Sequence, residues 1–325
     1  MTNRCRLFLC AICLLTTLAV ACREPSPPEV PTPIALGRGA PVAVSIDGQW
    51  LLVVRSEPEW NEGWLQPVDG GEGKKILQFT ATSFYATFSP DGRYLAWSSE
   101  GLWLAGPDGS DARRILADEV AGPLAWSPDS DRLAVVVGDK VKLIDLQGQE
   151  RAEVVQAESI RALSWSQLSS GERVFFASFP AEQPPYVAGV SPDGQGLATL
   201  AIAEAFDVAG DRIFVAEPLS AGPLRQLSAV DGTDAKVIVE SGIQSVAVRP
   251  PESGQVAYIL QSDDGVSGDL WLAAADGREQ RQLTAGAPIL GQLWSPDGRR
   301  LYFAVFDVNA GEEDDPFQVH ALDVP

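Results

Sequence analysis

The sequence has no cysteine after residue 22, because its four cysteines all lie in the first 22 residues. The rest of the chain therefore offers no disulfide, no cysteine nucleophile and no thiolate metal ligand. It contains one histidine, His320, which excludes a histidine-based metal centre within a single chain. No Gly-x-Ser-x-Gly motif occurs, so His320 has no hydrolase serine of that kind to activate. We expect no catalytic residue, no cofactor and no metal ligand, and a structural or surface role for His320.

Basic residues are scarce, since 24 Lys and Arg face 44 Asp and Glu and the net charge is −20. An excess of acid this large repels phosphate backbones, which excludes nucleic acid as a partner. The acids are scattered along the chain, as is typical of a solvated surface. Because a glycan-cleaving enzyme needs only two suitably separated carboxylates, the sequence leaves carboxylate catalysis open.

The amino-terminal hydrophobic run, Leu7–Ala21, is too short to span a bilayer comfortably, and it follows Arg4 and Arg6. This arrangement is typical of an export signal. The end of the run, Leu18-Ala19-Val20-Ala21-Cys22, resembles the lipobox of bacterial lipoproteins. The resemblance implies cleavage before Cys22 and lipid attachment to its side chain. More than one acyl chain on Cys22 would give durable membrane anchoring.

Prolines follow the lipobox, and they favour an extended polyproline II tether over helix or sheet. We therefore divide the chain into a lipoprotein signal peptide (1–22), a Pro-rich linker (23–33) and a folded domain (34–325). The expected location is the extracytoplasmic side of the cell envelope, on a membrane that the amino-terminal lipid anchors.

A phrase of about 40 residues recurs along the folded part, which is the mark of a repeat architecture. Phe88-Ser89-Pro90-Asp91-Gly92-Arg93 returns as Trp294-Ser295-Pro296-Asp297-Gly298-Arg299, and Trp126-Ser127-Pro128-Asp129 is a shorter copy. Proline presets the backbone angle of a turn, aspartate caps the turn, and glycine takes its positive φ. When this motif is used to mark the start of each repeat, the sequence contains seven units, 42–78, 86–117, 124–156, 163–201, 206–240, 246–286 and 293–323.

The second strand of each unit is apolar on both faces, as in Leu133–Val137, Val256–Leu260 and Leu301–Val305. An antiparallel strand of this kind must be covered on both sides, as it is between stacked blades. Four strands in each unit and no helical periodicity predict an all-β fold, a seven-bladed β-propeller of four-stranded antiparallel blades. The seventh unit stops after its third strand. Ile34–Arg38 is expected to supply the fourth strand and to close the ring by pairing the two chain ends.

The repeated phrases resemble the TolB-type repeats of the WD-like β-propeller superfamily. The resemblance covers residues 42–325. It implies a propeller like those of periplasmic scaffolds and of the non-catalytic propeller domains attached to peptidases. It carries no functional residue over to this chain, because the matched positions form turns and pack blades.

Loop length is the remaining functional signal. The connections between second and third strands vary widely, and in a blade they open on the face opposite the two short turns. Variable loops on a rigid scaffold usually carry binding residues. We predict a partner-binding face with an aromatic contact at Trp60 and acidic surroundings. Its candidate residues are Glu57, Glu59, Trp60, Pro184, Pro185, Asp263, Asp264, Glu312, Glu313, Asp314 and Asp315.

The sequence thus favours a monomeric, lipid-anchored propeller of the cell envelope that binds or scaffolds an envelope protein without catalysis. Two alternatives stay open. One is an envelope hydrolase or lyase that uses channel carboxylates on glycans or peptides, and the other is a ligand-binding sensor domain. Two acids that converge within about 10 Å in the central channel would favour the enzyme.

Overall fold

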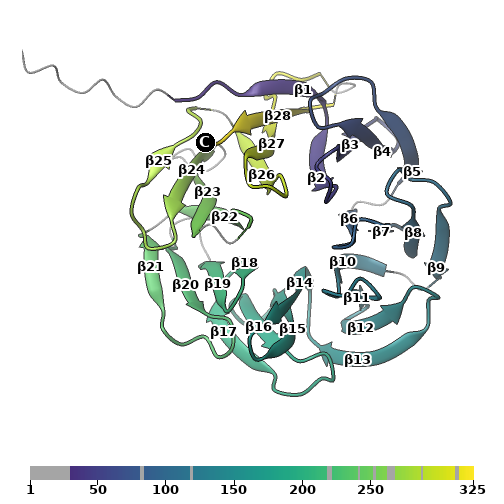
Figure 1. Cartoon of the computed structure of the whole chain (residues 1–325), viewed down its shortest axis with the longest axis vertical. Coiled ribbons are helices and arrows are strands. Elements are labelled where there is room, and N and C mark those ends of the chain that lie inside the picture. The colour runs from purple at the N-terminus through teal and green to yellow at the C-terminus, as the bar shows by residue number, and fades with distance from the viewer. Residues whose placement is uncertain are drawn as a thin grey trace, which may run out of the picture.

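The computed structural model describes residues 30–325 except 81–83, 118–119, 218–221, 241, 252–253, 262–267, 287 and 312–314. Its strands form seven four-stranded antiparallel sheets, the blades, around a central axis (Figure 1), and no helix occurs among the described residues. The all-β, seven-bladed propeller predicted from the repeats is confirmed.

In blades 1 to 6 the strands run outward from the axis in chain order. Blade 1 consists of β2 (Ala40–Val44), β3 (Trp50–Ser56), β4 (Asn61–Pro67) and β5 (Lys74–Phe79). Blade 2 consists of β6 (Tyr85–Phe88), β7 (Leu95–Ser98), β8 (Leu102–Ala105) and β9 (Arg113–Leu116). Blade 3 consists of β10 (Val120–Trp126), β11 (Arg132–Val137), β12 (Lys140–Asp145) and β13 (Glu150–Gln156). Blade 4 consists of β14 (Ile160–Leu168), β15 (Gly171–Ser178), β16 (Tyr186–Val190) and β17 (Ala198–Ile202). Blade 5 consists of β18 (Ala205–Ala209), β19 (Arg212–Ala216), β20 (Leu224–Ser228) and β21 (Lys236–Val239). Blade 6 consists of β22 (Ile243–Val248), β23 (Gln255–Gln261), β24 (Gly268–Ala274) and β25 (Arg281–Gln282).

Blade 7 joins the two ends of the folded domain. It consists of β26 (Ile289–Trp294), β27 (Arg300–Phe306), β28 (Phe317–Asp323) and β1 (Ile34–Arg38). β1 pairs antiparallel with β28, with Ile34 opposite Ala321 and Arg38 opposite Gln318. The predicted closure by the residues before the first unit is therefore confirmed, and Figure 1 shows β1 lying along the outer side of β28.

The serine and aspartate of the repeated turn explain why the phrase recurs. In blade 2, Ser89 Oγ donates to Asp91 Oδ1 (2.6 Å) and accepts from the backbone N–H of Tyr94 (3.0 Å). Asp91 Oδ1 also accepts from the N–H of Arg93 (3.0 Å), while Gly92 takes a φ of 72°. The same bonds surround Ser45 and Asp47, and Ser295 and Asp297. These residues fix the turn between the first and second strands.

The glycine of the turn between the third and fourth strands packs closely against the neighbouring blade in two examples. A Cβ on Gly148 of blade 3 would lie 1.9 Å from the carbonyl oxygen of Ile115, on the outer strand of blade 2. A Cβ on Gly232 of blade 5 would lie 2.6 Å from the carbonyl oxygen of Leu200 in blade 4. Glycine is therefore required both by its positive φ and by the close approach of two backbones.

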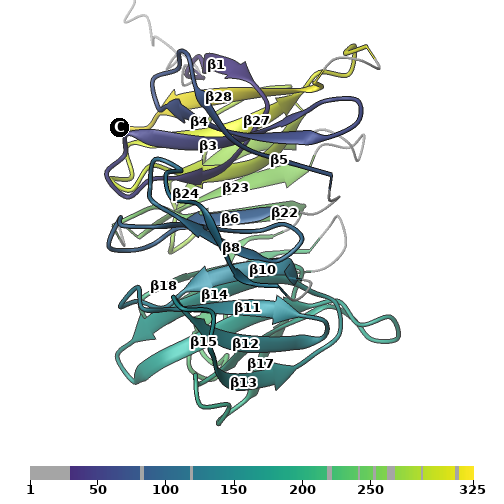
Figure 2. The same cartoon turned by 90° about the vertical axis from the view of Figure 1, so that its right-hand side faces the viewer.

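The core lies between the blades, which Figure 2 shows stacked one on another around the ring. One cluster joins blades 3 and 4 through residues such as Val136, Val141, Trp165 and Phe176. The motif tryptophans also bridge inner strands, since Trp126 Nε1 donates to the carbonyl oxygen of Thr87 (3.2 Å). The two-sided burial of the second strands follows directly from this stacking.

Candidate partner-binding face

The antiparallel order gives the ring two different faces. We call the face with the turns after the first and third strands the turn face. The opposite face carries the connections between second and third strands, and we call it the loop face. Among the described candidate residues, those of the β3–β4, β15–β16 and β27–β28 connections lie on the loop face.

The loops of blades 1 and 7 meet at one point on the loop face. Asp315, in the β27–β28 connection, accepts the N–H of Ser56 at the end of β3 (3.2 Å) and that of Phe317 (3.0 Å). Glu57 pairs with Arg38 of β1 at 3.3 Å, and its N–H donates to the carbonyl oxygen of Trp60 (2.9 Å). We call this meeting point the corner, defined by Arg38, residues 55–62, Trp64 and Asp315.

Glu62 holds the aromatic part of the corner in place. Its carboxylate accepts from Trp60 Nε1 (3.3 Å), Trp64 Nε1 (2.9 Å) and Lys75 Nζ (2.9 Å). The hydrogen bond from Lys75, aided by the two indoles, lowers the pKa of Glu62 although partial burial opposes the shift. Glu62 therefore stays ionised and fixes the orientation of both rings. Sequence analysis did not single out Glu62, the second residue of β4, because nothing local indicates that its carboxylate meets two indoles and Lys75 of β5.

The half-buried Arg55 and the buried Asp315 are the charges at the base of the corner. The guanidinium of Arg55 lies 4.3 Å from the centre of the Trp64 ring, and its Nη2 donates to Gln66 Oε1 (3.4 Å). Burial, and then the nearby Arg38, lowers the pKa of Arg55. Burial raises the pKa of Asp315 despite its two backbone hydrogen bonds. The corner thus joins an aromatic surface to charges of both signs.

The structure separates Pro184 and Pro185 from Trp60. They lie in the β15–β16 connection of blade 4, which sits across the ring from blade 1 (Figure 1). The carbonyl oxygen of Pro185 accepts the N–H of Ala203 (3.1 Å). A cavity of about 440 Å³ opens beside this loop, between Glu158 and Tyr186. The predicted residues therefore share a face without forming one contiguous site.

The remaining candidates have different outcomes. Glu59 is exposed at the corner. The others lie outside the described residues, namely Cys22, Asp263, Asp264, Glu312, Glu313 and Asp314.

His320 lies on β28, where its ring stacks on that of Phe303 with centroids 5.8 Å apart. Burial lowers the pKa of His320, and its Nδ1 has no hydrogen-bond partner. The neutral ring is therefore favoured near neutral pH, in keeping with the structural role expected for it.

Asp207 is the described carboxylate whose pKa is raised most strongly. It projects from the inner strand β18 and accepts the N–H groups of Val248 (2.7 Å) and Val208 (2.8 Å). Burial outweighs these two bonds and raises the pKa of Asp207 to about 6. Among the described carboxylates only Asp315 also has a raised pKa, and it lies at the corner, on a different blade.

Within residues 30–325 and outside the gaps named above, no three His, Cys, Asp or Glu side chains gather as they would around a metal ion. The same stretches contain no helix with the length and apolar character that crossing a membrane requires.

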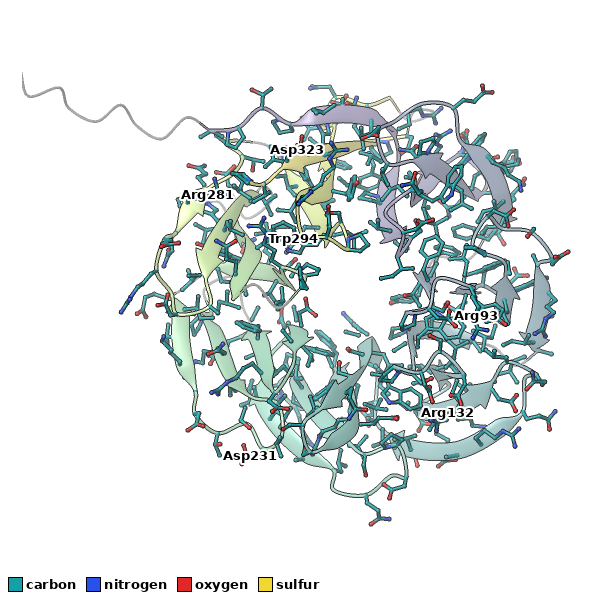
Figure 3. The ribbon with its side chains drawn as sticks, viewed as in Figure 1. Arg93, Arg132, Asp231, Arg281, Trp294 and Asp323 are labelled. Atoms are coloured by element: carbon teal, nitrogen blue, oxygen red, sulfur yellow. The ribbon has the colours of Figure 1, made fainter. Side chains whose placement is uncertain are left out.

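A hollow of about 750 Å³ lies on the turn face, bordered by the turns of blades 1, 6 and 7. Arg300, on its wall, bridges Asp323 of blade 7 and Asp69 of blade 1. Figure 3 shows Trp294 near the central opening and Asp323 farther out on the same blade. The sequence predicted short turns of similar length on this face. It did not predict the hollow, because the hollow is formed by residues of three different blades.

No protein-family model matches the chain, and no curated protein matches its sequence. Solved structures do share the fold. A prolyl endopeptidase matches with TM-score 0.64 and 14% identity over 89% of this chain, which spans 48% of that protein. TolB from Acinetobacter baumannii matches with TM-score 0.53 and 14% identity over 72% of this chain and 63% of TolB. A chain of a mitotic checkpoint complex matches over the full length of both, with TM-score 0.63 and 14% identity. At these identities the likeness establishes the β-propeller fold alone.

Proposed function

We propose that this protein is an exported, lipid-anchored propeller that binds a protein partner in the cell envelope through its loop face. The observation that carries the proposal is the corner, where Glu62 fixes Trp60 among Glu57, Glu59 and Asp315. Tryptophan is enriched among the residues that dominate binding energy in protein interfaces. The protein acts as a monomer and without catalysis.

The fold is compatible with this role. One structure with the same fold is a chain of a mitotic checkpoint complex, which is a protein assembly. Another is a prolyl endopeptidase, so the fold alone does not decide between binding and catalysis. The corner favours binding, because it presents a fixed tryptophan ring among acids on the loop face.

The position of β1 suits a tether. β1 is the outermost strand of blade 7, and the described chain before it leaves from the rim of the ring (Figure 1). An anchor attached there would leave both faces of the ring accessible. If Cys22 carries the lipid, then Cys22→Ser will move the protein from the membrane fraction to the soluble extracytoplasmic fraction. Membrane retention of the variant would contradict the anchor.

Partner binding is tested by cross-linking the native protein in cells and identifying what is captured by mass spectrometry. The variants Trp60→Ala and Glu57→Lys should lose the captured protein. Gln195→Lys is the matched control, since Gln195 is exposed on the turn face between β16 and β17. Equal capture by all variants would contradict a partner site at the corner.

The alternative function, a hydrolase or lyase acting on glycans or peptides, rests on the perturbed carboxylate of Asp207. A turnover screen with glycan and peptide substrates tests it, with Asp207→Asn beside the wild type. Turnover that the variant loses would favour the enzyme over the scaffold. The sensor alternative would instead place a small ligand in the hollow of the turn face, where thermal-shift screening would detect it.

A further inference from the structure

A groove between blades 1 and 2 lies beside the corner. It holds about 540 Å³, within the range of pockets that take small ligands and side chains. The outer strand β5 forms one wall with Ile76, Leu77 and Phe79. Trp97 of β7 and Trp103 of β8 form the other wall.

The tryptophan wall is rigid. Trp97 and Trp103 face each other across paired strands, and their rings stack with centroids 6.0 Å apart and planes within 3° of parallel. Trp103 Nε1 donates to the carbonyl oxygen of Ser99 (3.0 Å), which fixes the outer ring further. A partner side chain would therefore meet a surface that needs no reordering before binding.

The groove is closed at one end and open at the other. Gly109 packs against β5 towards the turn face, where an added Cβ would lie 2.6 Å from Ile76 Cγ2. At the loop face, Thr80, Ser99 and Glu100 line the other end of the groove, and Thr80 and Glu100 are exposed. The groove therefore opens on the face that carries the corner.

The strand register places the opening next to the corner. Phe79 pairs with Asn61, the residue after Trp60, and Gln78 pairs with Glu62. The nearby cations Lys75 and Arg38 are engaged with Glu62 and Glu57. Glu100 lines the opening and accepts only a long hydrogen bond from Thr80 Oγ1 (3.5 Å), and Glu59 is exposed at the adjoining corner. The exposed cation Arg114 lines the outer side.

We propose that this groove is the anchor pocket of the partner-binding face. It takes one aromatic or large aliphatic side chain from an extended segment of the partner protein. Lysine or arginine residues beside that side chain pair with Glu100 and Glu59. The inference rests on the proposed function, because it specifies the part of the partner that docks. Buried anchors surrounded by complementary charges are the usual pattern of tight protein interfaces.

The test uses random peptides of about 12 residues displayed on phage and selected on the full-length protein, because extended segments are common docking elements. Enriched peptides should share one large apolar residue with neighbouring Lys or Arg. Their synthetic forms should bind Glu100→Lys and Thr80→Trp at least about tenfold more weakly than the wild type. Thr80 is exposed at the opening, so tryptophan there blocks the groove without disturbing the core.

Gln195→Lys and Thr199→Trp are the matched controls on exposed sites of blade 4, and they should bind as the wild type does. Equal melting temperatures will show that the variants are folded. Peptides that lose binding only with Trp60→Ala would overturn the groove and leave the loop-face function standing. Selection without an apolar anchor or basic neighbours would also overturn it, and capture of the cellular partner would still decide the proposed function separately.

Discussion

Individual residues in the repeated turns act on both the turn itself and the neighbouring blade. Ser295 Oγ accepts from the N–H of Arg300 (2.9 Å) and donates to Asp297 (2.6 Å). This hydrogen bond from Ser295 leads the causes that lower the pKa of Asp297. Gly298 then brings the turn of blade 7 against the carbonyl oxygen of Pro250 in blade 6. One short phrase thus specifies a local turn and a contact between blades.

Two glycines at the same turn position separate these roles. Gly298 and Gly48 have nearly equal φ values of 69° and 67°. A Cβ added to Gly298 would lie 1.9 Å from the carbonyl oxygen of Pro250, whereas a Cβ added to Gly48 would have no atom of another residue within 4 Å, apart from its chain neighbours. Gly48→Ala should cost about 1 kcal/mol for the backbone angle alone. Gly298→Ala should cost about 2 kcal/mol more, because the two blades must separate. Urea denaturation measures both, and equal losses would contradict the inter-blade role.

Asp207 gives a pH dependence whose sign can be worked out. Its pKa rises to about 6 from an ordinary 3.8, so the folded state binds more protons than the unfolded state between these values. Its contribution to stability therefore falls by about 3 kcal/mol as pH rises through that window. Asp207→Asn should remove this fall. The measurement is the free energy of unfolding of the wild type and of the variant at several pH values between 3.8 and about 6. A difference between the two proteins that does not change with pH would contradict the raised pKa.

Single elements decide whether the ring closes. β28 carries the buried residues Val319 and Ala321, and β1 is the strand that pairs with its outer edge. An unpaired edge next to a buried face invites pairing with other chains. β1 is short and mostly exposed, yet it has the structural task that the sequence analysis predicted for it, which is to cover the outer edge of blade 7.

Deletion of residues 34–38 tests this task. We expect the melting temperature to fall by about 10 °C, because the outer hydrogen bonds of blade 7 are lost and 1 kcal/mol corresponds to about 2–4 °C in a domain of this class. Size-exclusion chromatography should also detect association through the free edge of β28. Deletion of five linker residues, 24–28, is the control. A monomer with unchanged melting temperature would show that β1 is dispensable.

The strands were predictable because turn chemistry and alternation are local. The unit predicted at 86–117 runs from Tyr85 to Leu116, and even the weakly marked unit at 206–240 runs from Ala205 to Val239. The groove was not predictable, because β5 and the wall of Trp97 and Trp103 belong to different blades. The sequence likewise placed Pro184 and Trp60 on one face but carried no information on their distance around the ring.

At the scale of the whole molecule, the net charge of −20 is spread over one closed ring. Many of the ion pairs are local and exposed, such as Arg93 with Asp91 and Arg278 with Asp276, and such pairs contribute little. Repulsion among the remaining acids should therefore outweigh attraction between the pairs. This balance can be measured without knowing the partner.

We expect the melting temperature at neutral pH to rise by a few degrees between about 20 and 300 mM NaCl, since salt at these concentrations screens exposed charges over distances of roughly 20 to 6 Å. The rise should shrink near pH 4, where protonation of carboxylates removes much of the repulsion. A fall with added salt would instead mean that attractive pairs dominate. The same field should attract a basic partner segment to the loop face, so salt that stabilises the isolated ring should slow its association with the partner.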